Sequence, residues 1–264
     1  MNLDAVIDLL AAQPAGTAIL TDFDGTLAEV MADPGSVTPL PGATDALVAL
    51  TEAGFGVTVI SGRPVTFLAE LLPDALDLSG LYGLEWRRNG TVGEHPGAGV
   101  WVPVISDVVE RARRDLSGVL VEPKRLTLTL HYRQCPDRQA EIEWFARREG
   151  ARTGLEARPA KMSVELHPPI AADKGTAVEE ALATGQPVEV AAFLGDDVGD
   201  LPAFAALERL AARGVRTVRV GVVTSETPPE LLAVTDVSVA GPAAAVSLLE
   251  DIAQRAVRAR RAGR

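Results

Sequence analysis

Residues 18–27 read Ala-Ile-Leu-Thr-Asp-Phe-Asp-Gly-Thr-Leu, and this stretch decides how the rest of the chain is interpreted. The apolar residues 18–20 predict a short buried strand. Asp22 and Asp24 then project to the same side of an extended chain, because alternate side chains share a face. Gly25 permits the tight turn that a side chain would obstruct. Ligands of an open α/β sheet bind beyond the carboxyl ends of its strands, so the stretch predicts a binding site with two acids.

The composition of the 264-residue chain is that of a globular protein with a substantial core, since 47% of its residues are apolar and 23% are charged. The formal net charge of −11 argues against a nucleic acid as partner, because its phosphates would be repelled. The single cysteine, Cys135, excludes an intramolecular disulfide and fits a reducing compartment. We find neither a signal-peptide pattern nor an apolar run of membrane length, and we expect a cytoplasmic monomer without a membrane partner.

Strands and helices alternate through both ends of the chain. The N-terminal part predicts helices 2–12, 41–53 and 65–72, strands 18–20, 57–60 and 81–84, and a hairpin over 86–101 that turns at Asn89-Gly90. The C-terminal part predicts helices 173–184, 200–212, 229–234 and 242–261, and strands 189–194, 216–222 and 236–239. This alternation is typical of an α/β fold with a doubly wound parallel sheet and right-handed crossovers.

The order of predicted helices and strands is different between these two parts. The pattern there predicts helix 104–116, strands 119–123 and 126–132, helix 137–149, and strands 155–160 and 162–166. Apolar and polar residues alternate along these strands, as in an antiparallel sheet with one covered face. We therefore expect a core formed by residues 1–103 and 171–264, with an inserted αββαββ domain over 104–170.

Four segments with polar or charged residues end predicted strands or begin predicted helices at one edge of the parallel sheet. Asp22 and Asp24, Ser61, Lys174, and the group Asp196, Asp197 and Asp200 all fall at one edge of it. Carboxylates this close repel one another, by about 4 kcal/mol for a pair at 4 Å and an effective dielectric constant of 20. A hard cation that prefers oxygen ligands removes that repulsion, and the sequence therefore predicts a Mg²⁺ site.

These residue types fit phosphoryl transfer through a carboxylate nucleophile. Asp22 is expected to attack phosphorus and to form an aspartyl phosphate. Asp24 is expected to protonate the leaving oxygen and later to activate water. Ser61 would hold phosphate oxygens, and Lys174 would supply a fixed positive charge to the phosphate and to Asp22.

The predicted metal site consists of Asp22, the carbonyl of Asp24, and Asp196. We expect Asp197 and Asp200 to orient these ligands rather than to bind the ion directly. An ordinary helix cap or a surface residue is the usual meaning of a lone serine or aspartate, but all these residues together in this order point to a site.

With these residues, the chain resembles the haloacid dehalogenase (HAD) superfamily of phosphatases. The resemblance rests on four motifs in order: Asp22-Phe23-Asp24-Gly25-Thr26, Ser61-Gly62-Arg63-Pro64, Lys174-Gly175 and Gly195-Asp196-Asp197-Val198-Gly199-Asp200. Within the superfamily the chain is similar to the trehalose-6-phosphate phosphatase family, through Leu130-His131-Tyr132-Arg133, Lys161-Met162-Ser163-Val164-Glu165-Leu166 and Asp200-Leu201-Pro202-Ala203-Phe204. This resemblance implies Mg²⁺-dependent hydrolysis of trehalose 6-phosphate in trehalose biosynthesis. It also implies a HAD core with an αββαββ cap domain.

The resemblance also implies where the sugar phosphate binds. Arg63 lies in the second motif and is assigned to the substrate. Cap positions of the family that contact the sugar correspond here to Glu122, Lys124, Arg133, Lys161 and Glu165. A polar sheet face usually faces solvent, but near a phosphate site it is suited to hydrogen bonds with sugar hydroxyls.

Some positions depart from the family pattern and leave the sugar open. Gly199 and Leu201 stand where the family commonly has threonine and glutamate, and Tyr82 and His167 stand where it commonly has histidine and arginine. Sucrose phosphate and a glycosyl-glycerate phosphate are therefore alternative substrates. A sugar-phosphate sensor without catalysis, or an accessory domain of a synthase, is a further alternative. Such a protein would be expected to lose Asp22 or Asp24, and both are present.

Overall fold

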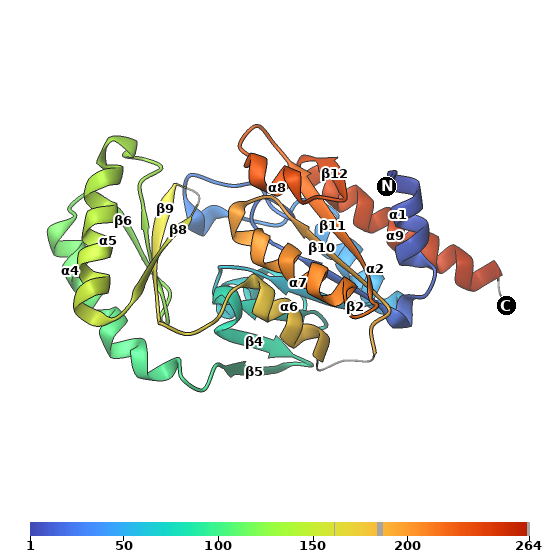
Figure 1. Cartoon of the computed structure of the whole chain (residues 1–264), viewed down its shortest axis with the longest axis horizontal. Coiled ribbons are helices and arrows are strands. Elements are labelled where there is room, and N and C mark those ends of the chain that lie inside the picture. Colours follow the sequence, from blue (N-terminus) through green and yellow to red (C-terminus); the bar gives the residue numbers. More distant parts are fainter. Residues whose placement is uncertain (161, 184–186, 263–264) are drawn as a thin grey trace. The chain divides into compact units, whose positions relative to one another are not determined.

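The computed structural model of the chain describes residues 1–160, 162–183 and 187–262 and divides into two compact units (Figure 1). The first unit consists of Met1–Val92 and Ala172–Arg264, and the second of Gly93–Ala171. Residues 93–103 thus group with the second unit, whereas they were expected to belong to the core. The pattern could not place this boundary, because residues 93–103 contain no long element of their own.

The first unit is built on an eight-stranded sheet with the strand order β12-β11-β10-β1-β2-β3-β4-β5. Neighbouring strands from β12 through β3 run parallel, and β4 is antiparallel to β3. The strands are β1 (Thr17–Thr21), β2 (Gly56–Ile60), β3 (Asp77–Gly80), β4 (Glu85–Arg88), β5 (Thr91–Glu94), β10 (Val190–Gly195), β11 (Arg216–Val223) and β12 (Val237–Ala240). The chain winds outward in both directions from β1, as the sequence predicted.

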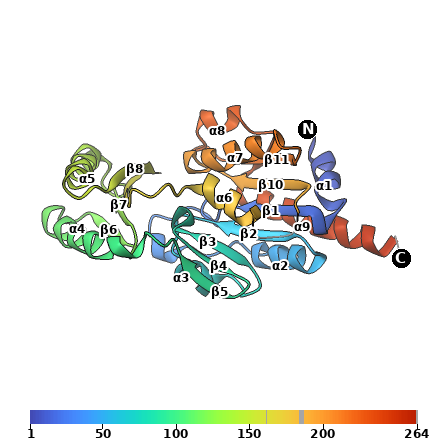
Figure 2. The ribbon, with the colours of Figure 1, turned by 60° about the horizontal axis from the view of Figure 1, so that its bottom comes forward.

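Helices cover both faces of this sheet (Figure 2). One face packs on α1 (Leu3–Ala11), α2 (Ala43–Ala53), α3 (Val65–Leu71) and α9 (Gly241–Ala262). The other packs on α6 (Lys174–Ala183), α7 (Leu201–Ala211) and α8 (Pro229–Ala233). Strand β1 is buried throughout because Ile19 joins the first cluster while Ala18 and Leu20 join the second. A strand covered on both faces reads as a continuous apolar run, which is why it could be found from the sequence.

The third strand of the sheet was predicted wrongly at 81–84. Strand β3 ends at Gly80, and Leu81–Gly83 forms a 3₁₀ turn. Leu81, Tyr82 and Gly83 have φ values of 48°, 59° and 102°, which no extended strand can accommodate. The predicted turn of the hairpin is confirmed, since Asn89 and Gly90 both have positive φ, as a two-residue hairpin turn requires. Its strands end at Glu94, however, so the hairpin is shorter than predicted.

The second unit has the predicted αββαββ order. It contains α4 (Val102–Asp115), β6 (Leu120–Pro123), β7 (Leu128–His131), α5 (Gln139–Thr153), β8 (Glu156–Ala160) and β9 (Ser163–His167). The antiparallel sheet has the order β6-β7-β9-β8. Leu128, Leu130, Val164 and Leu166 pack with α4 and α5 in one apolar cluster, which confirms the predicted apolar face.

The strand register determines which polar residues share the opposite face of this sheet. Thr129 of β7 lies directly opposite Glu122 of β6 on one side and Glu165 of β9 on the other. Glu165 is in turn opposite Arg158 of β8. Because side chains of directly opposed residues point the same way, these residues form one polar row across the sheet.

Candidate active site

Three parallel strands of the first unit end at the same edge and bring the predicted residues together there. Asp22 follows β1, Ser61 follows β2 and Asp196 follows β10, while Lys174 begins α6. The backbone N–H of Asp22 continues the sheet by donating to the carbonyl of Leu194 at 2.9 Å. Hydrogen bonding within the sheet therefore fixes the backbone position from which the Asp22 side chain extends.

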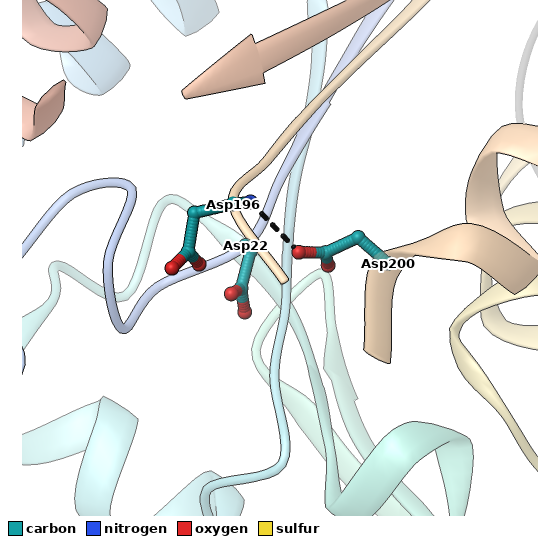
Figure 3. A group of neighbouring side chains, drawn as sticks. All are labelled: Asp22, Asp196 and Asp200. Atoms are coloured by element: carbon teal, nitrogen blue, oxygen red, sulfur yellow. Dashed lines mark hydrogen bonds between the residues drawn. The ribbon is translucent and has the colours of Figure 1, made fainter. Parts of the chain in front are cut away.

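Lys174 joins two of the acids. Its Nζ lies 2.7 Å from Asp22 Oδ1 and 2.6 Å from Asp200 Oδ1. The second oxygen of Asp200 accepts hydrogen bonds from the backbone N–H groups of Asp196 at 2.9 Å and Asp197 at 3.1 Å. Asp200, which is fully buried, thus holds both the lysine and the turn that carries Asp196. Figure 3 shows Asp200 on one side and the Asp22 and Asp196 carboxylates side by side.

Asp197 has a local role in the same turn. Its Oδ1 accepts a hydrogen bond from the N–H of Val198 at 2.6 Å, and with Asp200 it forms a capping box at the start of the following 3₁₀ turn (Val198–Asp200). These contacts are of the kind expected for Asp197 and Asp200, which were predicted to orient ligands rather than to bind the ion.

Negative charge exceeds positive charge in this cluster. Carboxylate oxygens of Asp22, Asp196 and Asp200 lie within 4.8 Å of one another, and each residue is at most 5% exposed. Burial raises the pKa of Asp22 well above its usual range, and the charges of Asp200 and Asp196 add to this while Lys174 opposes it. Burial would lower the pKa of Lys174, but the Asp200 and Asp22 carboxylates raise it further than burial lowers it. Such a site favours a cation.

The donor set of this cluster fits Mg²⁺. Asp22 and Asp196 offer oxygens to an ion, whereas both oxygens of Asp200 are already used by Lys174 and the backbone. Gly25 leaves the space that the Asp196 carboxylate needs, since a Cβ at Gly25 would lie 2.2 Å from Asp196 Oδ2. Its φ of 80° also favours glycine. The glycine of the first motif is thus required on both grounds.

The Asp24 carboxylate is paired with Arg63. Arg63 Nη2 lies 2.7 Å from Asp24 Oδ1 and its Nε lies 2.8 Å from Oδ2, a bidentate geometry that fixes both side chains. Arg63 also donates to the carbonyl of Pro34 at 2.7 Å, and its guanidinium lies 4.6 Å from the ring centre of Phe67. This pair was not predicted from the sequence, because the two residues lie 39 positions apart and follow different strands.

Ser61 is held by its backbone and by the turn that follows it. Its side chain is buried, and its Oγ accepts a hydrogen bond from the N–H of Arg63 at 3.1 Å. Its N–H donates to the carbonyl of Ser79 at 2.9 Å, and its own carbonyl accepts from the N–H of Tyr82 at 3.0 Å. The hydroxyl hydrogen of Ser61 is thus left to serve as a donor.

In the second unit two of the predicted sugar-binding residues, Glu122 and Glu165, lie in the polar row. Glu122 Oε2 lies 2.7 Å from His131 Nε2 and 3.9 Å from Lys124 Nζ. Glu165 is 2% exposed, and its Oε1 has no hydrogen-bond partner among the described residues. Arg133 follows β7 and is half-buried, while Lys161 lies outside the described residues. His131 was not among the predicted site residues; the strand register places it diagonally across from Glu122, and the side-chain distance shows the contact.

A model of the trehalose-phosphatase family matches residues 20–232 of the chain. The chain belongs to the trehalose-phosphatase family. It is 32% identical over 225 residues to the trehalose-phosphate phosphatase of Mycobacterium leprae, a match that covers 80% of this chain and 52% of that protein. The chain therefore spans about half the length of the curated family members it matches.

Solved structures of related proteins share the fold. The C-terminal domain of Candida albicans trehalose-6-phosphate phosphatase has a TM-score of 0.78 at 19% identity, covering 96% of this chain and 97% of that one. A trehalose-6-phosphate phosphatase related protein has a TM-score of 0.73 at 23% identity, covering 92% and 99%. Haloacid dehalogenase-like hydrolases are also among the structural neighbours, which confirms the predicted HAD-type α/β fold. Among the helices in the described ranges, none is both long and apolar enough to cross a membrane.

Proposed function

We propose that the chain is a Mg²⁺-dependent phosphatase that hydrolyses trehalose 6-phosphate to trehalose and phosphate. The family membership supports the reaction class and the substrate. The observation that carries the proposal is the buried cluster at the edge of the sheet, in which Lys174 bridges Asp22 and Asp200 beside Asp196. This acid-rich cluster needs the positive charge of a divalent cation, and the cation together with Lys174 would then attract the anionic phosphate ester.

The proposed reaction has two steps. In the first, an oxygen of Asp22 attacks phosphorus, the ester bond to the sugar oxygen breaks, and that oxygen takes a proton from Asp24. In the second, water attacks the aspartyl phosphate and gives a proton to Asp24, which releases phosphate and restores the Asp22 carboxylate. Lys174 holds Asp22 in place, and the Ser61 hydroxyl donates to a phosphate oxygen. Bound Mg²⁺, held by Asp22, the Asp24 carbonyl and Asp196, would neutralise charge on the acids and the phosphate.

In the structure the Asp24 carboxylate is held by Arg63, so this scheme requires Asp24 to leave the ion pair and to take up a proton from solvent before the first step. We predicted that Arg63 binds substrate, and its fork of N–H groups matches a phosphate as well as it matches a carboxylate. Asp24→Asn tests the proton-transfer role, because an amide cannot exchange the proton. The variant is expected to lower turnover about 10²- to 10⁴-fold.

We further propose that the second unit acts as a cap domain and recognises the sugar through its polar row. Glu122, Lys124, Arg133, Lys161 and Glu165 are the proposed contacts. Oε1 of Glu165 is buried and has no hydrogen-bond partner among the residues that the structure describes, and a ligand hydroxyl would remove the cost of that. Glu165→Ala is therefore expected to lower kcat/KM for trehalose 6-phosphate about tenfold or more, while leaving a small aryl phosphate nearly unaffected. Equal losses on both substrates would make Glu165 a structural residue.

A phosphate-release assay over a panel of sugar phosphates tests the assignment of substrate. With Mg²⁺ present, trehalose 6-phosphate is expected to have the highest kcat/KM, above sucrose phosphate and a glycosyl-glycerate phosphate. A higher kcat/KM for another sugar phosphate would keep the phosphatase chemistry and change the substrate. Absence of turnover on every member, with Asp22 and Asp24 intact, would favour a sugar-phosphate sensor. The cytoplasmic location and monomeric state remain predictions from the sequence.

A further inference from the structure

The turn Leu81–Gly83 has an unusual backbone. Leu81 and Tyr82 both lie in the left-handed region, with φ of 48° and 59°, and Gly83 follows with a φ of 102°. In the described part of the chain, no other two adjacent non-glycine residues both have positive φ. This region is unfavourable for residues with a side chain, and such conformations persist only where the surroundings impose them.

Backbone contacts with the turn that carries Ser61 impose this conformation. The N–H of Leu81 donates to the carbonyl of Arg63 at 3.0 Å, and the N–H of Tyr82 donates to the carbonyl of Ser61 at 3.0 Å. Gly80 allows the close approach, because a Cβ there would lie 2.7 Å from the backbone nitrogen of Val65. The two turns are therefore docked together along their backbones.

The ring of Tyr82 adds a contact that the backbone alone does not require. A Cβ at Gly62 would lie 2.6 Å from the Tyr82 hydroxyl oxygen and 2.7 Å from its Cζ, so the outer end of the ring rests against Gly62. Glycine would adopt the left-handed backbone at position 82 with less strain. Tyr82 thus carries backbone strain that a glycine would avoid, and its ring makes a contact with Gly62 that a glycine could not make.

We propose that Tyr82 is a positioning residue for Ser61, whose ring presses on Gly62 and keeps the turn 61–63 in the shape that presents the Ser61 hydroxyl to phosphate. This inference rests on the proposed function in one respect, the assignment of Ser61 to a phosphate oxygen. Ser61 Oγ accepts from the N–H of Arg63, so the direction of its hydroxyl depends on the conformation of Gly62 between them. A shift of the turn by about 1 Å can lower a rate by as much as 10²-fold.

A double-mutant cycle tests the contact between the ring and Gly62. In the wild-type background, Gly62→Ala places a methyl group against the ring and is expected to lower kcat/KM for p-nitrophenyl phosphate about tenfold. In the Tyr82→Gly background the methyl group has room, and Gly62→Ala is expected to cost about twofold or less. Equal losses in the two backgrounds would overturn the proposed contact.

The decisive comparison is between Tyr82→Gly, Tyr82→Phe and the control Asn89→Gly, which relieves a left-handed residue (φ 48°) in the exposed hairpin turn. Tyr82→Gly is expected to lower kcat/KM about tenfold or more for both p-nitrophenyl phosphate and trehalose 6-phosphate, well below the melting temperature. It should also speed amide hydrogen exchange at residues 61–63. Tyr82→Phe keeps the ring and should stay within about threefold of wild type, and Asn89→Gly should have wild-type activity.

Each outcome distinguishes this proposal from the proposed function. A wild-type protein that hydrolyses p-nitrophenyl phosphate but not trehalose 6-phosphate would refute the substrate and leave the Tyr82 test intact. If no phosphate ester is hydrolysed at all, the rates of amide hydrogen exchange at residues 61–63 decide whether Tyr82 positions this turn. Unchanged exchange in Tyr82→Gly would overturn the proposal, as would unchanged kcat/KM. A loss in Tyr82→Phe as large as in Tyr82→Gly would also overturn it, since the hydroxyl rather than the ring would then act.

Discussion

Two buried carboxylates, Asp200 in the first unit and Glu149 in the second, are surrounded by opposite charge in different proportions. Glu149 is 1% exposed and accepts from Arg148 at 3.0 Å and Arg152 at 2.7 Å, with Arg111 at 4.0 Å. Asp107 and Asp115 pair with the outer sides of these arginines. Positive charge there at least equals negative charge, and the network ties α4 to α5.

Asp200 is buried among other acids instead. Lys174 pairs with Asp22 and Asp200, and the Asp196 carboxylate lies beside them, so these four side chains together carry an excess of negative charge. A closed network such as that of Glu149 needs nothing further, whereas an acid-rich cluster is stable only with an added cation or with protons. The difference teaches that charge balance, rather than burial of an acid, separates a structural network from a candidate catalytic site.

The largest expected effect of this difference is on activity. Asp22→Asn removes the nucleophile, since a neutral amide is a poor one, and kcat/KM should fall roughly 10⁴-fold or more. Glu149→Gln, measured at a temperature where the protein is folded, should retain wild-type kcat/KM. Phosphate release from trehalose 6-phosphate measures both. Appreciable turnover by Asp22→Asn, after deamidation to aspartate has been excluded by mass spectrometry, would remove Asp22 from its role.

The next largest effect is on stability, and it is expected at Glu149, where no effect on activity is expected. Glu149→Gln leaves the cations Arg111, Arg148 and Arg152 without their central acid and should lower the free energy of unfolding by about 2 kcal/mol. This figure is below that for a fully buried pair because the arginines remain partly exposed. Urea denaturation with and without Mg²⁺ measures it, and the loss should be the same in both. A loss that Mg²⁺ reverses would mean that Glu149 belongs to a metal-dependent network.

Asp196→Asn is expected to have a smaller effect on the free energy of unfolding. Whether the variant is more or less stable than wild type is the informative result. Removing one of the mutually repelling acids should raise the unfolding free energy by about 1 kcal/mol in EDTA. Mg²⁺ should then stabilise the variant much less than it stabilises wild type, because a ligand that binds the folded state raises its stability. Thermal melts of both proteins in EDTA and in Mg²⁺ give the comparison. A variant that is less stable than wild type in EDTA would show that the cluster is balanced without a cation.

The smallest effect is expected at an ion pair on the periphery of the first unit, Arg219 with Asp236 at 2.7 Å. Burial acts to raise the pKa of Asp236, but hydrogen bonds from Arg219 lower it more, and the net pKa is below its usual 3.8. The stabilisation is therefore complete above the unfolded-state value of 3.8 and is lost as the pH falls through the lower folded-state pKa. Asp236→Asn should cost at most about 1 kcal/mol at neutral pH.

Urea titrations of wild type and Asp236→Asn over a range of pH check this. The difference between them should stay constant from about pH 7 to pH 5 and shrink only in stronger acid. A difference that already disappears near neutral pH would contradict the lowered pKa.

The sequence predicted much of the candidate catalytic cluster, because the cluster follows from the topology of the sheet. Parallel strands bring their carboxyl ends to one edge, so Asp22, Ser61 and Asp196 could be placed together from their positions after apolar runs. The pairing of Asp24 with Arg63 could not be predicted, since it depends on side-chain directions in two different turns. The neighbours of Glu122 required the strand register, which alternation alone does not give.

The error at the third strand has a specific physical cause. The residues 81–84, Leu-Tyr-Gly-Leu, have the composition of a buried strand, and neither leucine nor tyrosine favours a left-handed backbone. The conformation is imposed by hydrogen bonds to the carbonyls of Ser61 and Arg63, about twenty residues earlier. A tertiary contact therefore overrides the local strand propensity here, where the chain lies next to the turn that carries Ser61.

The most direct test of the central claim is the rate of phosphate release from trehalose 6-phosphate as Mg²⁺ is added to protein first stripped with EDTA. The acid excess around Lys174 predicts no turnover in excess EDTA and a saturable rise in rate with Mg²⁺, which Asp196→Asn should nearly abolish. Full activity in excess EDTA would contradict the proposed metal site and the account of charge balance on which it rests.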